Sequence, residues 1–475
     1  MRNCYSQIPI EGIYEDVTSS FEKDKPEFLQ MIEDYIDFET LIPYEFNMAF
    51  YRGLGRPREY SLEGFIRFFV LQKVLGVSSD SLMLKFLSLS MELRKFCGFV
   101  KVPDAPMITR FRQDFVGYIN AVFDRLVDIT EPICREISKK KADYLIYDTT
   151  GIEAYVAENN PKFLNAILSQ CKKIAKSNNE INPYALAYSK MPETANANPF
   201  VRQQYANGHF CYAHKAGILT NGLGIVRDIA VFDDGFKFRH PEAVSQKTDN
   251  PDLDKEVGDS TSLKPVLEDF FKKHPGFSYK TFIGDSSFDS YDNFEMLRDV
   301  FHFERVAVPM NKRNSSAAHK DYNEDGVPVC PIDRTPFTYI GPAGGRNRSQ
   351  RFKWVCHKSK LIHGTSSRLC SCLTPCTCAT GGRYAYTSPN KDFRLCPGIA
   401  RGTVHWDNLY RHRVVAERTI NLIKDPYGVA DRKSFSVRTA KADLLFACIT
   451  QLIGVVIAHA IKKPELYKSI RKLIA

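Results

Sequence analysis

Two apolar runs of strand length, each ending in an aspartate, place the strongest constraint on how this chain folds. YLIYD ends at Asp148 and YKTFIGD ends at Asp285. Between them, HKAGILTNGLGIVRDIAVF places Asn221-Gly222 between two apolar stretches, a strong signal for a β-hairpin. A helix pattern, YDNFEMLRDV, and a further strand pattern, RVAVPM, follow. The order strand, hairpin, strand, helix, strand predicts a mixed α/β sheet in which two strands end in carboxylates.

Residues 1–140 have the pattern of a helical domain. Ser61 is suited to cap a helix through LEGFIRFFVLQKVL, Gly76 is suited to end it, and a second helix follows in DSLMLKFLSLS. A third helix, in MITRFRQDFVGYINAVF, carries Arg110 and Arg112 in its first turns. These helices fit a helix-turn-helix unit that lays the arginine-bearing helix on double-stranded DNA. They fit equally well a helical packing domain whose arginines are exposed to solvent.

Three acidic residues are placed for chemistry: Asp148 and Asp285 at predicted strand ends, and Glu417 in a predicted helix through WDNLYRHRVVAERTINLIK. Strand ends on one edge of a sheet converge, so these carboxylates can share a small volume. Without a cation they would repel one another, and hard oxygen ligands suit Mg²⁺ or Mn²⁺. For either aspartate alone, a turn or a helix cap is the simpler explanation. The helix around Glu417 is what favours a metal site.

That helix carries Tyr410, Arg413, Glu417 and Lys424 at spacings of three, four and seven residues. With 3.6 residues per turn, these spacings place all four side chains on one helix face. The face presents a carboxylate for a metal ion beside two cations and a phenol. Such a set can hold a DNA phosphodiester next to a metal site, although a solvated helix face can have the same spacing by chance.

The pattern Tyr-x2-Arg-x3-Glu-x6-Lys, with the strand motifs YDTTGI and GDSSFDS, resembles that of the DDE transposases of bacterial insertion sequences. The resemblance extends to the helical region from Pro57 to Phe115. It implies an α/β fold with an RNase H-like mixed-sheet catalytic core. It also implies that Asp148, Asp285 and Glu417 form a catalytic triad that binds Mg²⁺ (or Mn²⁺).

Four parts of the chain are expected on this basis: an N-terminal helical, DNA-binding domain, the first part of the catalytic core, a basic cysteine-rich insertion, and the C-terminal helices of the core (1–140, 141–310, 311–405 and 406–475). The expected activity is metal-dependent cleavage of the element ends, followed by attack of the freed 3′-hydroxyl on target DNA. A homodimer bound to the terminal inverted repeats is expected to carry it out. Two alternatives stay open: a catalytically silent DNA-binding protein derived from a transposase, and an RNase H-like nuclease that only hydrolyses.

The insertion concentrates positive charge and cysteine. Residues 311–410 contain 15 basic and six acidic residues, although the whole chain has a net charge of only +10. A polyanion such as DNA is the natural partner of this stretch, and a solvated basic loop is the alternative. The run CSCLTPCTC supplies Cys370, Cys372, Cys376 and Cys378, whose thiolates could hold a structural Zn²⁺. Free thiols or redox pairs are the competing interpretation.

The cysteine count and the first residues of the sequence indicate where in the cell the protein is expected. No apolar stretch of signal-peptide length opens the sequence, and 13 cysteines are an odd number, so we expect the reducing cytoplasm, at the bacterial nucleoid. Residues 442–461, ADLLFACITQLIGVVIAHAI, are long and apolar enough to suggest a membrane span. Because they include Asp443, Gln451 and His459, we expect a buried helix and no membrane contact.

Overall fold

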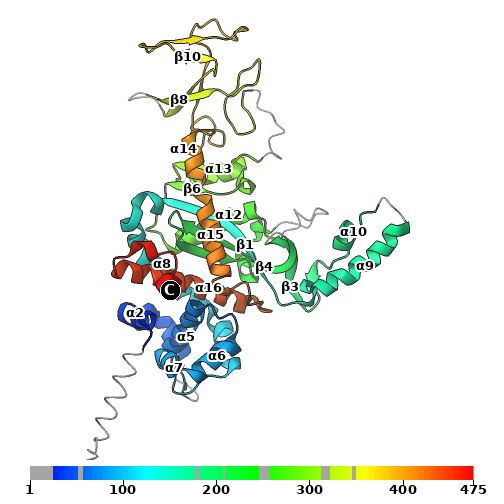
Figure 1. The fold of residues 1–475 in the computed structure, drawn as a ribbon, viewed down its shortest axis with the longest axis vertical. Coiled ribbons are helices and arrows are strands. Elements are labelled where there is room, and N and C mark those ends of the chain that lie inside the picture. Colours follow the sequence, from blue (N-terminus) through cyan, green and yellow to red (C-terminus); the bar gives the residue numbers. More distant parts are fainter. Residues whose placement is uncertain are drawn as a thin grey trace, which may run out of the picture. The chain divides into compact units, whose positions relative to one another are not determined.

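The computed structural model describes residues 25–51, 57–177, 181–206, 209–244, 256–311, 321–344 and 349–473. The protein divides into two compact units (Figure 1). The first combines Met1–Ile133, Ile152–Tyr155 and Asn421–Ala475, and the second combines Cys134–Gly151 and Val156–Ile420. Residues from Asn421 onward belong to the same compact unit as the N-terminal helices, and the expected domain boundaries stay a prediction.

Helices make up the first unit, and polar caps set where they begin. Ser61 accepts a hydrogen bond from the backbone N–H of Gly64 and caps the predicted helix, and Gly76, at a φ of 67°, ends it. Ser79 and Ser90 cap the next two helices in the same way. The helices of this unit are α2 (Glu27–Tyr35), α3 (Phe38–Leu41), α4 (Tyr44–Phe50), α5 (Leu62–Leu75), α6 (Asp80–Leu89), α7 (Met91–Phe96), α8 (Ala105–Ala142) up to Ile133, α16 (Val437–Ala460) and two short 3₁₀ helices, Pro464–Leu466 and Ile470–Leu473.

Helix α16 is the apolar centre of the first unit. Among the described residues it is the one helix whose length and composition would allow it to cross a membrane, but 89% of its most apolar window is buried inside the protein. Phe446 stacks on Phe69 of α5 with the ring centroids 4.4 Å apart. The predicted burial of this helix is therefore confirmed.

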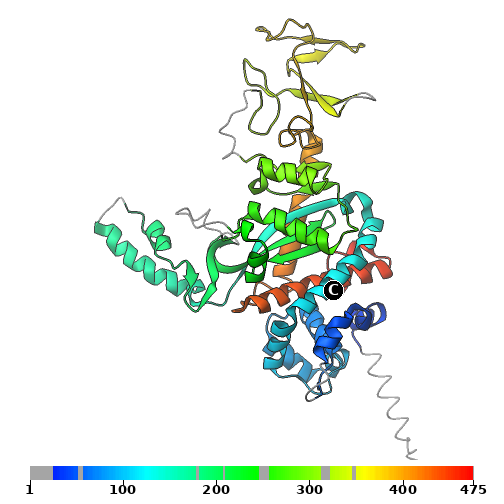
Figure 2. The same ribbon diagram turned by 180° about the vertical axis from the view of Figure 1, so that it is seen from behind.

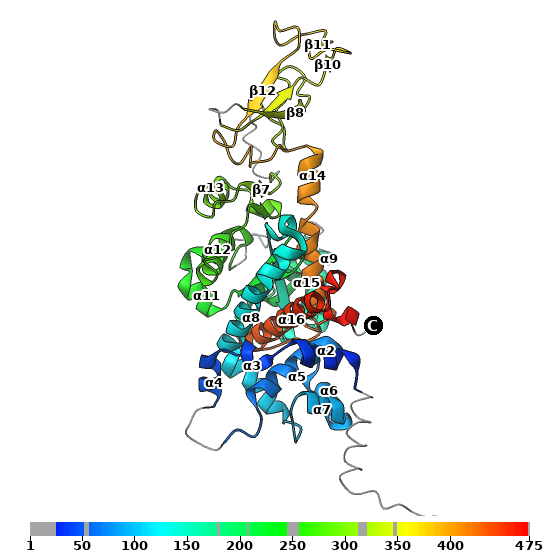
Figure 3. The same cartoon turned by 90° about the vertical axis from the view of Figure 1, so that its left-hand side faces the viewer.

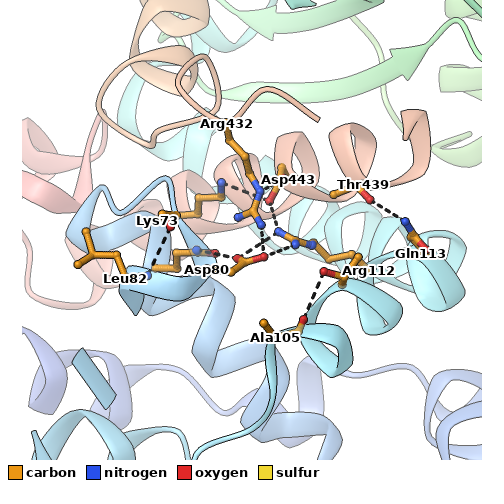
Figure 4. A network of polar contacts seen from close by, with 12 residues as sticks. Lys73, Asp80, Leu82, Ala105, Arg112, Gln113, Arg432, Thr439 and Asp443 are labelled. Atoms are coloured by element: carbon orange, nitrogen blue, oxygen red, sulfur yellow. Dashed lines mark hydrogen bonds and ion pairs between the residues drawn. The ribbon is translucent and has the colours of Figure 1, made fainter. Parts of the chain in front are cut away.

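Five charged side chains form a buried network beside α16 (Figure 4). Asp443 of α16 contacts Arg112 at 3.0 Å and Arg432 at 2.8 Å. It also lies 3.5 Å from the ammonium of Lys73, and Asp80 pairs with both arginines. Burial favours the neutral acid, yet Arg112 and Arg432 hold the pKa of Asp443 down at about 2.

This network overturns one prediction about DNA contacts. Arg112 is only 1% exposed and is committed to Asp80 and Asp443, so the prediction that it binds DNA is wrong. The physical reason is the burial of a carboxylate far along the chain, which requires a cation beside it. Arg110, two residues earlier, is exposed, and its DNA contact stays a prediction.

A seven-stranded mixed sheet forms the centre of the second unit. Its strands are β1 (Tyr144–Glu153), β2 (Thr194–Ala195), β3 (Asn198–Ala206), β4 (His209–Asn221), β5 (Val226–Val231), β6 (Thr281–Ile283) and β7 (Arg305–Ala307). The order is β2-β3-β4-β1-β6-β7, with β5 paired to β4. Strands β1, β6 and β7 run parallel, and β2 to β5 pair antiparallel. The predicted hairpin is β4–β5, whose turn is held by the Asn221 carboxamide accepting from the N–H groups of Leu223 and Ile225.

Alternation along β1 lets helices cover both faces of the sheet (Figures 2 and 3). Leu145 and Tyr147 face one apolar cluster, which α12 (Asp259–Lys273) and α13 (Tyr291–Asp299) complete. Tyr144 and Ile146 face the other, completed by α14 (Val404–Tyr410) and α15 (Arg413–Lys424). The remaining helices of this unit are the end of α8, α9 (Pro161–Ser177), α10 (Pro183–Ser189), α11 (Asp234–Arg239), and the 3₁₀ helices Ala157–Asn159, Pro241–Ala243 and Ser286–Phe288.

The insertion contains more regular structure than its sequence indicates. Strands β8 (Thr338–Ala343), β9 (Arg351–Val355) and β12 (Tyr384–Thr387) form one antiparallel sheet, and β10 (Ser359–Leu361) and β11 (Arg368–Cys370) form a second. Its small core is built from Val327, Phe337, Phe352, Trp354 and Ala400 with Cys330, Cys356 and Cys396. Three of these eight buried residues are cysteines.

The network around Asp443 generates a stability prediction. Asp443→Asn leaves three buried cations facing only Asp80, so we expect the free energy of unfolding of the first unit to fall by about 3–5 kcal/mol. The measure is helical circular dichroism during denaturation at pH 7. The folded pKa lies below the ordinary value, so the wild-type advantage is complete above about pH 4 and declines as the pH falls through about 2.

The matched control is Glu63→Gln. Glu63 forms an i,i+4 pair with Arg67 and its side chain is 38% exposed, so its loss should cost less than about 1 kcal/mol. Equal effects of the two substitutions would contradict the assignment of the network as a structural core.

Candidate active site

Parallel pairing aligns the two predicted catalytic aspartates. Ile146 of β1 is paired with Ile283 of β6, and Asp148 and Asp285 each follow two residues later. The two carboxylates therefore lie at the same level of neighbouring strands. The prediction that Asp148 ends its strand is wrong, because β1 continues to Glu153. Asp285 does follow the end of β6.

Local hydrogen bonds fix both aspartates. Asp285 is the N-cap of the 3₁₀ helix Ser286–Phe288 and accepts from the backbone N–H of Ser287 at 2.8 Å and from its hydroxyl. Asp148 accepts from the backbone N–H of Thr149 at 2.9 Å. Asp285 therefore does cap a helix, which was the alternative to metal binding in the sequence analysis. The two roles are compatible, since one cap bond leaves other oxygen lone pairs available.

Helix α15 brings an arginine to these carboxylates. The guanidinium of Arg413 lies 2.6 Å from the Glu417 carboxylate and 3.9 Å from that of Asp148. Tyr410 does not share this helix, because α14 ends at Tyr410 and α15 begins at Arg413, which corrects the predicted single helix. Burial and the neighbouring Asp285 and Glu417 raise the pKa of Tyr410, and Arg413 opposes them.

Lys424 occupies the last position of α15. Seven residues, about two helical turns, separate it from Glu417, so it lies about 10 Å further along the helix axis. The spacing that predicted a shared face therefore places Lys424 where it could follow a DNA backbone beyond the carboxylates. Its contact with DNA stays a prediction.

Burial and the neighbouring charges together shift the pKa of Asp148. Burial raises the pKa of Asp148 to about 6, Arg413 lowers it, and Asp285 and Glu417 raise it further. Arg413 responds in the opposite sense: burial would lower its pKa, but Asp148 and the other anions around it raise it. Arg413 forms ion pairs with Asp148 and Glu417, and Asp285 adds a third negative charge to the cluster.

The donor chemistry of this cluster suits a hard divalent ion such as Mg²⁺ or Mn²⁺. Among the residues that the structure describes, no three His, Cys, Asp or Glu side chains are arranged to hold a metal ion. At the carboxylates, the guanidinium of Arg413 engages Glu417. Metal binding by Asp148, Asp285 and Glu417 stays a prediction.

Sequence reasoning missed the second aspartate of GDSSFDS. Asp289 is 2% exposed and accepts two hydrogen bonds from the guanidinium of Arg394, at 2.8 and 2.6 Å. It also accepts from the backbone N–H of Asn311 at 2.7 Å. One buried carboxylate thus holds both ends of the insertion. The signal available in the sequence was the second aspartate of the motif, but nothing indicated its partners.

The predicted thiol cluster is only partly brought together. Cys370, Cys372 and Cys376 line one cavity, whereas Cys378 is exposed and lies outside its lining. Two cysteines from elsewhere in the insertion, Cys330 and Cys356, complete the lining. The sequence analysis did not group these two cysteines with the others, because they lie far from the run CSCLTPCTC in sequence.

A comparison with protein families bears on the first unit. Residues 17–114 match a family model described as "Transposase domain (DUF772)". No curated protein matches the chain. The matched segment covers the N-terminal helices and ends before all three carboxylates. Over these residues the chain is similar to a transposase domain.

Substitutions of the two aspartates of GDSSFDS should have different effects on stability, because Asp289 is part of a buried ion pair and Asp285 belongs to the candidate active site. Asp289→Asn leaves Arg394 buried without its carboxylate, so the second unit should lose about 3–5 kcal/mol of unfolding free energy. Asp285→Asn removes one repelling charge from Asp148 and should leave that free energy within about 1 kcal/mol of wild type. Both tryptophans, Trp354 and Trp406, lie in this unit, so their fluorescence reports its unfolding.

Asp299→Asn is the control for these two variants. Asp299 pairs with Arg298 on the surface and its side chain is 58% exposed, so little change is expected. An Asp289→Asn protein as stable as Asp299→Asn would contradict the tethering role of Asp289.

Proposed function

We propose that this protein is a DDE-type DNA transposase that cleaves the ends of an insertion sequence and transfers them to target DNA. The observation that carries the proposal is the register of β1 and β6, which aligns Asp148 with Asp285 within reach of the α15 arginine and Glu417. The transposase-domain match at the N-terminus supports the same family independently. In this proposal the mixed sheet is an RNase H-like core.

The residues have distinct roles in the proposed reaction. Asp148, Asp285 and Glu417 would hold Mg²⁺ (or Mn²⁺), which when bound activates the attacking oxygen and stabilises the leaving oxygen of phosphoryl transfer. Arg413 neutralises the carboxylates while DNA is absent and would exchange Glu417 for a phosphate oxygen of the bound strand. Tyr410 and Lys424 would position the same strand.

The proposed partners are double-stranded DNA at the terminal inverted repeats and at the target, bound by a homodimer at the bacterial nucleoid in the cytoplasm. The exposed Arg110 would contribute to duplex binding from the first unit. The basic residues of the insertion that are not committed to buried carboxylates would add to it.

Substitution of the carboxylates tests the catalytic assignment. Asp148→Asn, Asp285→Asn and Glu417→Gln should each reduce Mg²⁺-dependent cleavage of DNA carrying the terminal repeats by about 100-fold or more, because each removes a metal ligand at nearly constant volume. Binding to the same DNA in gel shifts should be retained. Glu268→Gln, an exposed carboxylate change on α12, is the control. Near-wild-type cleavage by any of the three would remove that residue from the site.

A second test concerns the cations of α15. Arg413→Ala and Lys424→Ala should weaken binding to cleaved element ends more than binding to random duplex DNA. On random duplex, each substitution removes one phosphate contact among many, which changes the slope of log affinity against log salt concentration by only about one unit. Lys264→Ala, an exposed lysine of α12, is the matched control. Equal losses on both DNAs would identify these side chains as ordinary backbone contacts.

A further inference from the structure

The cavity in the insertion gathers thiols from three separate segments. Cys330 comes from the turn before β8, Cys356 from the end of β9, and Cys370 and Cys376 from the end of β11 and the loop that follows it. Cys330 and Cys356 are each 3% exposed. The residues are distant in sequence, so the fold itself brings them together.

Tight turns present these sulfurs. The backbone N–H of Arg334 donates to the carbonyl of Cys330 at 3.0 Å, and that of Ser359 donates to the carbonyl of Cys356 at 2.9 Å. Strand pairing of Ser359 with Cys370 places the second and third thiols side by side. Turns of this kind hold a cysteine at a fixed position with its sulfur pointing away from the chain.

The four thiols interact in two pairs, Cys356 with Cys370 and Cys330 with Cys376. Lys358 and Arg383 line the same cavity and can balance the charge of thiolates. Of the other two cysteines in the run, Cys372 also lines the cavity but donates to the carbonyl of Thr374, and Cys378 is exposed.

We propose that Cys330, Cys356, Cys370 and Cys376 bind one structural zinc ion as thiolates. Binding breaks four S–H bonds, forms four Zn–S bonds and releases four protons. Because no three of the described side chains stand at metal-binding positions, the two pairs must draw together across the cavity to reach Zn–S distances of about 2.3 Å. Three of the eight buried residues in the small core of the insertion are cysteines, and small domains commonly depend on a metal for their stability.

This ligand set differs from the contiguous one predicted from the run CSCLTPCTC, and single substitutions in the full-length protein separate the two. Purified wild type should contain about one zinc per chain. Cys330→Ser and Cys356→Ser should reduce the zinc content at least about tenfold, since three thiolates bind zinc far more weakly than four. The matched controls Cys372→Ser and Cys378→Ser should keep it.

Because a ligand variant can lose zinc through misfolding, cobalt in the wild-type protein provides a measure that needs no variant. Replacing zinc with Co²⁺ should give the tetrahedral absorption bands and the strong thiolate charge-transfer band of a four-sulfur site. Zinc retained by Cys330→Ser or Cys356→Ser, or zinc lost from Cys372→Ser or Cys378→Ser, overturns the proposed ligand set. A wild-type protein without zinc after expression in zinc-supplemented medium, or one whose alkylation pattern shows disulfides within the two pairs, overturns the metal site altogether.

Discussion

Parallel pairing of β1 with β6 is the constraint on which the second unit depends. It joins strands separated by the whole hairpin and α12, and it fixes which face each side chain of β1 covers. A shift of one residue in the pairing of β1 with β6 would exchange the two apolar faces of β1. Asp148 would then no longer be aligned with Asp285. The core and the carboxylate cluster are therefore specified by the same register.

Buried carboxylates in the two units differ because their surroundings differ in charge. Asp443 has three cations around it, and its pKa falls in spite of burial. Asp148 has one arginine and two further carboxylates, and its pKa rises. The first arrangement surrounds one carboxylate with cations, and the second leaves three carboxylates close to one another with a single arginine. That contrast is typical of the difference between structural and functional ion clusters.

Local signals explain how much of this could be predicted from the sequence. Caps at Ser61 and Gly76 and the Asn221 hairpin act over a few residues, so they were predicted correctly. The burial of Arg112 depends on a carboxylate 331 positions away, and the thiol cavity depends on three distant turns. The break after Tyr410 leaves the helical spacing nearly unchanged, so periodicity could not detect it.

Attachment of both ends of the insertion to Asp289 has a consequence for chain length. With Asn311 and Arg394 bound to one carboxylate, the segment between them is a loop closed at Asp289. Lengthening such a loop raises its closure entropy cost only slowly, by about 0.6 kcal/mol for each doubling. The exposed turn between β10 and β11 is therefore a position where residues can be added or removed, or a foreign domain grafted, without disturbing the turn that carries Asp285.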